Sequence, residues 1–236
     1  MLKFMRISLV STWYLTTLLL VFIISLFRPF NTKNAHLFCQ IGPRICRHWL
    51  GIKIIEKNLK NLTQAQPCVY IANHQNILDI IFLAAVFPQN SVVIGKKAVR
   101  WIPLFGWVFW LSGHLLVERK DFTKAMSTMG EAQEAIEKRG VSIWLFPEGT
   151  RSEGRGLLPF KKGAFHLAID AQVPIVPIVA SAYFGKLNLN KPNAGTVTVE
   201  ALPPIETKGK TKDDVDDLLN QAHKLFENQL AAQTQV

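Results

Sequence analysis

The residues best suited to chemistry are a histidine and an aspartate in the string NHQNILD. His74 follows the apolar run CVYIAN (68–73), which has the composition of a buried strand, and Asp79 comes five residues later. Ligands of α/β proteins bind beyond the carboxyl ends of strands, so an imidazole at this point is well placed to act as a general base. Asp79, in the first turns of the next helix, could accept the Nδ1 proton and leave the other nitrogen free to take a proton from a hydroxyl.

A histidine near an aspartate is a weak signal on its own, because a purely structural pair has the same pattern. The chain has no G-x-S-x-G elbow, and Cys39, Cys46 and Cys68 show no metal-ligand spacing. We expect these cysteines to be reduced, buried thiols without chemistry. A serine or cysteine hydrolase would therefore lack a nucleophile, which implies that the substrate supplies it. An alcohol that attacks an activated acyl group meets this requirement.

A second string, FPEGTRS (146–152), falls at the end of another predicted strand, VSIWLF (141–146). Pro147 and Gly149 favour a turn whose amides can face an anion, and Arg151 can hold a phosphate with two donors. A basic, glycine-rich loop is by itself also typical of solvated surface. The case for a binding site depends on what lies beside this loop.

Further cations follow two other predicted strands, Lys96-Lys97 after SVVIG and Arg119 at the end of HLLVER. Strand ends then bring His74, these cations and the loop from Glu148 to Arg151 to one edge of a sheet. An acid/base pair beside several cations predicts a pocket for a phosphate-bearing alcohol. The sequence has no Walker loop, dinucleotide fingerprint or metal-ligand cluster, so we expect no nucleotide, metal or other cofactor.

Alternating strand-like and helix-like runs predict an α/β fold. The helix-like run from Phe122 to Lys138 has one apolar face and is followed by Arg139 and Gly140, which suit a helix end. The tail from Lys212 to Ala231 begins with aspartates and has an apolar stripe, so it is predicted to be a packing helix. The predicted strands are residues 68–73, 91–95, 114–119, 141–146, 173–180 and 196–203.

The start of the chain is predicted to hold the protein at a membrane. Ile7 to Phe27 are 21 residues without a charge, which is long enough to span a bilayer. A signal peptide is the alternative, but its apolar core is usually shorter and ends at small residues, whereas this run is followed by arginine and proline. His36 to Leu50 mixes apolar and basic residues and is predicted to be an interfacial helix, which Gly42-Pro43 should break or kink. Whether the first helix spans the bilayer or enters one leaflet stays open.

The net charge limits the classes of binding partner that suit this protein. With 27 Lys and Arg against 17 Asp and Glu, the net charge of +10 suits nucleic acid, anionic headgroups or an acidic carrier protein. The apolar start of the chain favours the membrane. The aromatic stretch from Trp101 to Trp110 could be core, membrane-facing surface or the wall of an acyl tunnel, and its density favours some interfacial contact. We expect an anchoring region, residues 1–50, and one catalytic domain, residues 51–236.

Together these strings resemble the glycerolipid acyltransferase family, and within it the bacterial 1-acyl-sn-glycerol-3-phosphate acyltransferases. The likeness runs from about Ile71 to Pro204. It includes H-x4-D at His74 and Asp79, a block ending in Arg119, the string FPEGTRS, and VPIVP from residue 173 to 177. The resemblance implies a mixed central sheet flanked by helices.

The resemblance also implies a reaction and roles for residues. His74, oriented by Asp79, would deprotonate the sn-2 hydroxyl of lysophosphatidic acid, which would attack a thioester of coenzyme A or acyl carrier protein and give phosphatidic acid. The acyl thioester is then a co-substrate, and membrane lipid rather than nucleic acid is the expected surroundings. The implied phosphate-binding residues are Lys96 (or Lys97), Arg119, Glu148, Gly149, Thr150 and Arg151. The block Val173, Pro174 and Ile175 would serve acyl donor binding or local architecture.

Some alternatives remain at this point. The bacterial resemblance and the cations that follow the first helix imply the inner (cytoplasmic) membrane, with the catalytic domain facing the cytoplasm. The acceptor could instead be glycerol 3-phosphate or another lysophospholipid. A non-catalytic lipid-binding protein and a hydrolase that uses water are rivals from other classes. An intact His74 and Asp79 pair argues against a pure binding protein.

Overall fold

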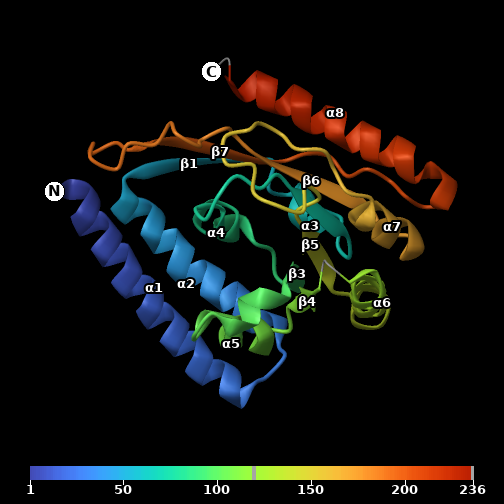
Figure 1. Ribbon diagram of the computed structural model, residues 1–236, viewed down its shortest axis with the longest axis horizontal. Coiled ribbons are helices and arrows are strands. Elements are labelled where there is room, and N and C mark those ends of the chain that lie inside the picture. The colour runs from blue at the N-terminus through green and yellow to red at the C-terminus, as the bar shows by residue number, and fades with distance from the viewer. Residues whose placement is uncertain (119–120, 235–236) are drawn as a thin grey trace.

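A seven-stranded mixed sheet forms the centre of the computed structural model, which describes residues 1–118 and 121–234 (Figure 1). Within these residues the strand order is β1-β7-β6-β2-β5-β3-β4. The strands are β1 (Ile52–Lys57), β2 (Val69–Ala72), β3 (Ser91–Lys96), β4 (Leu115–Val117), β5 (Ser142–Leu145), β6 (Ile175–Ala180) and β7 (Gly195–Ala201). The prediction of a mixed sheet flanked by helices is confirmed.

Strand direction decides which side chains meet. Strands β6, β2, β5, β3 and β4 are parallel, whereas β7 is antiparallel to β6 and parallel to β1. The carboxyl ends of β2, β5 and β3 therefore lie at one edge of the sheet. These are the strands that precede the NHQNILD string, the FPEGTRS string and Lys97, so the topology brings the three segments to the same edge.

Helices cover both faces of the sheet, giving three layers (Figure 1). The α-helices are α1 (Leu2–Phe27), α2 (Thr32–Leu50), α3 (Asn61–Gln64), α4 (Asp79–Phe82), α5 (Phe105–Leu111), α6 (Phe122–Arg139), α7 (Gly163–Asp170) and α8 (Val215–Thr234). Short 3-10 turns are η1 (Ala84–Val86), η2 (Lys97–Trp101) and η3 (Lys212–Asp214). An apolar core lies on each face of the sheet, and alternate residues of β2 point into one or the other. Tyr70 and Ala72 pack with α1 and α2, and Val69 and Ile71 pack with α6, α7 and α8.

The six predicted strands are present, with shifts at their ends, and β1 was missed. β1 borders only β7, and Lys53, Glu56 and Lys57 are exposed, so no continuous apolar run marks it. The two later helices are confirmed. α6 ends at Gly140, whose left-handed φ of 59° closes the helix. The tail helix begins at a capping box in which Thr211 and Asp214 each accept from the other's main chain.

The prediction at Gly42-Pro43 was a break or a kink. A break is wrong, because α2 runs without interruption from Thr32 to Leu50 with Pro43 inside it, and a kink stays a prediction. A proline within a helix costs about 3 kcal/mol. Both residues are buried, and a Cβ at Gly42 would lie 3.4 Å from Cγ2 of Thr17, so α1 and α2 lie close together at this point.

Helix α1 is the one helix of the described chain that is long and apolar enough to cross a bilayer, and most of its surface is exposed. Its start is nevertheless fixed to the body of the protein. The buried guanidinium of Arg6 donates to the carbonyls of Leu189, Lys191 and Pro192 at 3.0, 2.7 and 2.7 Å. Helix α2 contributes Phe38 to the same apolar core as the sheet. The division into residues 1–50 and 51–236 stays a prediction.

Candidate active site

Side chains extend the pairing of β2 beyond its last residue. Asn73 donates from Nδ2 to the carbonyl of Ala180 and accepts from the N–H of Ala180, both at 2.8 Å. Gln75 donates to the carbonyl of Ser181 at 2.9 Å and accepts from the N–H of Tyr183 at 3.0 Å. The chain on either side of His74 is therefore fixed to the end of β6.

The predicted pair of His74 and Asp79 is formed. Nδ1 of His74 lies 2.6 Å from Oδ2 of Asp79, the first residue of α4, whose side chain is almost fully buried. The same oxygen accepts from the main-chain N–H groups of Gln75 at 2.7 Å and Asn76 at 3.1 Å. Because Oδ2 acts as an acceptor in all three contacts, the proton between the side chains belongs on Nδ1. Nε2 is then the nitrogen that can accept a proton.

The other faces of the imidazole are also constrained. The ring stacks on Phe146, with centroids 4.1 Å apart and planes 21° from parallel. Phe146 packs against the apolar core that includes α1 and α2, so the His74 ring stacked on it lies on the α2 side of the sheet. The His74 side chain is 20% exposed, and within the described residues Nε2 has no hydrogen-bond partner. The geometry presents one basic nitrogen to a ligand.

The FPEGTRS loop is built onto the His74 segment. Glu148 is buried and accepts from the N–H of His74 at 2.6 Å and from the N–H of Leu158 at 3.0 Å. The N–H of Ser152 donates to the carbonyl of His74 at 2.8 Å. Burial raises the pKa of the Glu148 carboxyl, and its two main-chain donors oppose that rise. Glu148 therefore connects the main chain at His74 to the main chain at Leu158.

The outer part of the loop carries the exposed groups. Gly149 has a left-handed φ of 71°, and a Cβ there would lie 2.9 Å from Nζ of Lys161, so glycine lets the lysine approach the main chain. Thr150 and Arg151 are exposed. The positive charge of Arg151 is close enough to act on Tyr183, which contacts the dyad. Sequence reasoning did not single out Lys161 as a ligand.

Of the predicted strand-end cations, the two lysines can be placed. Lys96 ends β3 and is exposed at the edge that also holds the FPEGTRS loop. Arg119 lies outside the described residues. Neither Lys96 nor Arg151 has an acidic partner among residues 1–118 and 121–234. Lys97 begins η2 and lines a separate hollow beside β4. In the described part of the chain, no three His, Cys, Asp or Glu side chains cluster to hold a metal.

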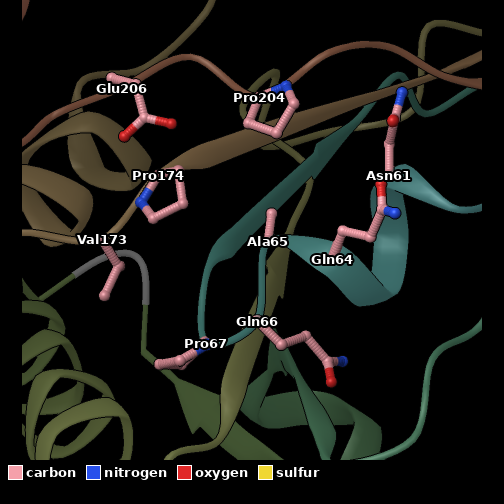
Figure 2. Close-up of a pocket in the computed structure, with 9 residues that line it drawn as sticks. All are labelled: Asn61, Gln64, Ala65, Gln66, Pro67, Val173, Pro174, Pro204 and Glu206. Atoms are coloured by element: carbon pink, nitrogen blue, oxygen red, sulfur yellow. The ribbon is translucent and has the colours of Figure 1, made fainter.

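The block Val173, Pro174 and Ile175 lies at the opposite edge of the sheet. Val173 and Pro174 line an open pocket of about 460 Å³ with residues of α3 and of the segment after β7 (Figure 2). Ile175 is fully buried and starts β6, whereas Asn73 bonds to the last residue of that strand. Five residues of strand put about 16 Å between the two points. The structure does not bring this block to His74, which favours local architecture.

Tyr183 is a candidate site residue that the sequence patterns did not indicate. Its hydroxyl lies 2.6 Å from Oδ1 of Asp79, the oxygen that His74 does not use. The residue is 2% exposed. Burial, followed by the negative charge of Asp79, raises the pKa of Tyr183 well above its usual value, so the phenol keeps its proton and donates. No motif marks a lone tyrosine 104 residues along the chain from its partner.

We expect Tyr183→Phe to leave His74 in place but to lower turnover about 10- to 100-fold, the cost of one hydrogen bond to a charged group. The measurement is acyl-transfer turnover at saturating substrate. Tyr14→Phe is the matched control, because the buried Tyr14 hydroxyl has no hydrogen-bond partner among the residues that the structure describes. Turnover near wild type in Tyr183→Phe would contradict this role.

Comparison with known proteins agrees with this architecture. The model of the family described as Acyltransferase matches residues 53–181. The chain is 40% identical to the 1-acyl-sn-glycerol-3-phosphate acyltransferase of Haemophilus influenzae, covering 98% of this chain and 96% of that protein. It is 42% identical to the Escherichia coli protein of the same name (87% and 84% covered) and 35% identical to the human alpha form (91% and 76%).

A solved structure shows the same fold. The 1-acyl-sn-glycerophosphate acyltransferase of Thermotoga maritima superposes with a TM-score of 0.74 over 98% of both chains, at 21% sequence identity. The helix-flanked sheet of this chain thus has the fold of a solved acyltransferase. The chain belongs to the acyltransferase family, among relatives named 1-acyl-sn-glycerol-3-phosphate acyltransferases.

Proposed function

We propose that this enzyme transfers a fatty acyl group from acyl-CoA or acyl carrier protein to the sn-2 hydroxyl of 1-acyl-sn-glycerol 3-phosphate, giving phosphatidic acid in phospholipid synthesis. The acceptor is the one in the names of relatives that match most of the chain. The observation that carries the proposal is the Nε2 atom of His74, which has no hydrogen-bond partner in the described chain, on a side chain that is 20% exposed, while Asp79 holds Nδ1. No cofactor is needed, because the thioester already activates the acyl group.

The dyad accounts for each proton in this reaction. The acceptor hydroxyl gives its proton to Nε2 of His74 as its oxygen attacks the thioester carbonyl. The tetrahedral intermediate then expels the thiolate, which takes that proton back from His74. Asp79 keeps its bond to Nδ1–H and offsets the positive charge that the ring gains. The thiol of the donor leaves with phosphatidic acid.

Cations at the same sheet edge would hold the acceptor's phosphate. Arg151 and Lys96 are exposed and have no acidic partner in the described chain, and Lys161 reaches the main chain at Gly149. Arg119 and Thr150 complete the proposed set. A phosphomonoester carries close to two charges, so several cations suit it better than the phosphodiester of a lysophospholipid.

We place the enzyme at the bacterial inner membrane with its catalytic domain in the cytoplasm, where both thioester donors occur. Helix α1 supplies the apolar anchor. The His74 ring lies on the α2 side of the sheet, the side that also carries α1. A lysolipid and its two-chain product reside in the bilayer, so this arrangement would keep the dyad near substrate.

His74→Ala should lower turnover by about 10²- to 10⁴-fold, because a positioned general base contributes a factor of that size. The measurement is transfer of labelled acyl groups from acyl-CoA, and separately from acyl carrier protein, to lysophosphatidic acid by protein in detergent micelles. His166→Ala on α7, in the opposite helical layer, is the control and should keep full activity. Turnover near wild type in His74→Ala would refute the assignment, and release of free fatty acid without acceptor would indicate a hydrolase.

Arg151→Ala should raise the KM for lysophosphatidic acid about tenfold or more, the equivalent of one lost hydrogen bond between charged groups, and leave the KM for acyl donor within about twofold. The comparison variant Lys208→Ala removes an exposed cation from the segment after β7 and should change neither constant. A defect confined to the donor would mean that the phosphate binds elsewhere.

A further inference from the structure

A second hollow, of about 510 Å³, lies between β4, α6 and η2 and has an excess of positive charge. Its cations are Lys97, Arg100, Lys124 and Arg139, against the carboxylates Glu118 and Glu131. Lys124 is paired with Asp121 at 2.8 Å, whereas the other three cations have no acidic partner in the described chain. The hollow is suited to an anion.

One wall of this hollow belongs to the end of the apolar helix. Phe30, in the turn between α1 and α2, lines it together with Trp110 of α5, and the two rings meet edge to face at 5.0 Å. The N–H of Phe30 donates to the carbonyl of Leu111 at 2.7 Å, which fixes the turn to α5. The guanidinium of Arg100 lies 5.4 Å from the centre of the Trp110 ring.

Large apolar side chains stand exposed next to the hollow. Trp101 is 79% exposed, Trp107 51% and Ile102 48%. Trp107 also contacts Phe22 of α1, with ring centroids 5.7 Å apart, so this surface continues the exposed apolar surface of α1. In Figure 1, α5 lies beside the end of α1 that is far from the N-terminus.

We propose that residues 97–111 form a second membrane contact, and that the basic hollow beside them takes the headgroup of an anionic phospholipid of the bilayer. The inference rests on the proposed membrane attachment through α1. Tryptophans favour the boundary between headgroups and acyl chains, and cations just outside that boundary meet the lipid phosphates. Continuity with α1 favours a bilayer over a soluble partner. Two contacts on different elements fix the orientation of the catalytic domain, which a single helix leaves free to rotate.

Hydrogen exchange on the full chain in vesicles tests this contact. We expect the amides of residues 97–111 to exchange about tenfold more slowly in phosphatidylcholine vesicles that contain phosphatidylglycerol than in phosphatidylcholine alone, since each cation at an anionic surface contributes about 1 kcal/mol. Arg100→Gln with Arg139→Gln should abolish that difference. The control pair Lys57→Gln with Lys208→Gln removes two exposed cations elsewhere and should preserve it.

The outcomes separate this inference from the proposed function. Equal exchange in both kinds of vesicle, or a difference that survives Arg100→Gln with Arg139→Gln, overturns the lipid contact even if acyl transfer is normal. Loss of the difference in the control pair overturns it too, because the effect is then one of total charge. If the expected pattern appears in a protein that transfers no acyl group, the membrane contact stands and the proposed reaction falls. Thermal unfolding in micelles checks that each variant is folded.

Discussion

The site depends on the buried carboxylate of Asp79, which accepts from residues 74–76 and from Tyr183. Two main-chain N–H groups and Nδ1 of His74 converge on one oxygen, and the Tyr183 hydroxyl takes the other. A carboxylate removed from water is costly unless such donors replace its hydration. Here the same donors fix the tautomer and orientation of the imidazole. The catalytic geometry is thus part of the fold of this sheet edge.

Parallel strands explain why segments distant in sequence meet at this edge. β2 delivers His74, β5 delivers the loop whose Glu148 supports the His74 main chain, and β3 ends in Lys96. The opposite edge holds Val173 and Pro174, which line an open pocket away from His74. The proposed chemistry and the proposed membrane contact of residues 97–111 lie on the side of the sheet that carries α1 and α5, and the basic hollow lies between that contact and α6. Helix α8 covers the other face of the sheet (Figure 1).

Sequence patterns predicted the features that depend on neighbouring residues of one segment. Apolar runs marked the buried strands, and the positions of His74 and Asp79 relative to a strand end predicted their contact. The patterns failed where tertiary packing decides. β1 mixes apolar and charged residues at the border of the sheet. Helix α2, which packs beside α1, continues through Pro43. Tyr183 reaches Asp79 only because β6 ends beside β2. Such contacts depend on strand order, which spacing within one segment does not encode.

The most direct test of the account is the protonation state of His74 itself. Nitrogen NMR of protein labelled with ¹⁵N-histidine, with the His74 signals assigned by their loss in His74→Gln, reports which ring nitrogen carries the proton. We predict that the neutral ring carries its proton on Nδ1 and leaves Nε2 unprotonated, as the contact with Asp79 requires. A neutral ring protonated on Nε2 would contradict a general base oriented by Asp79.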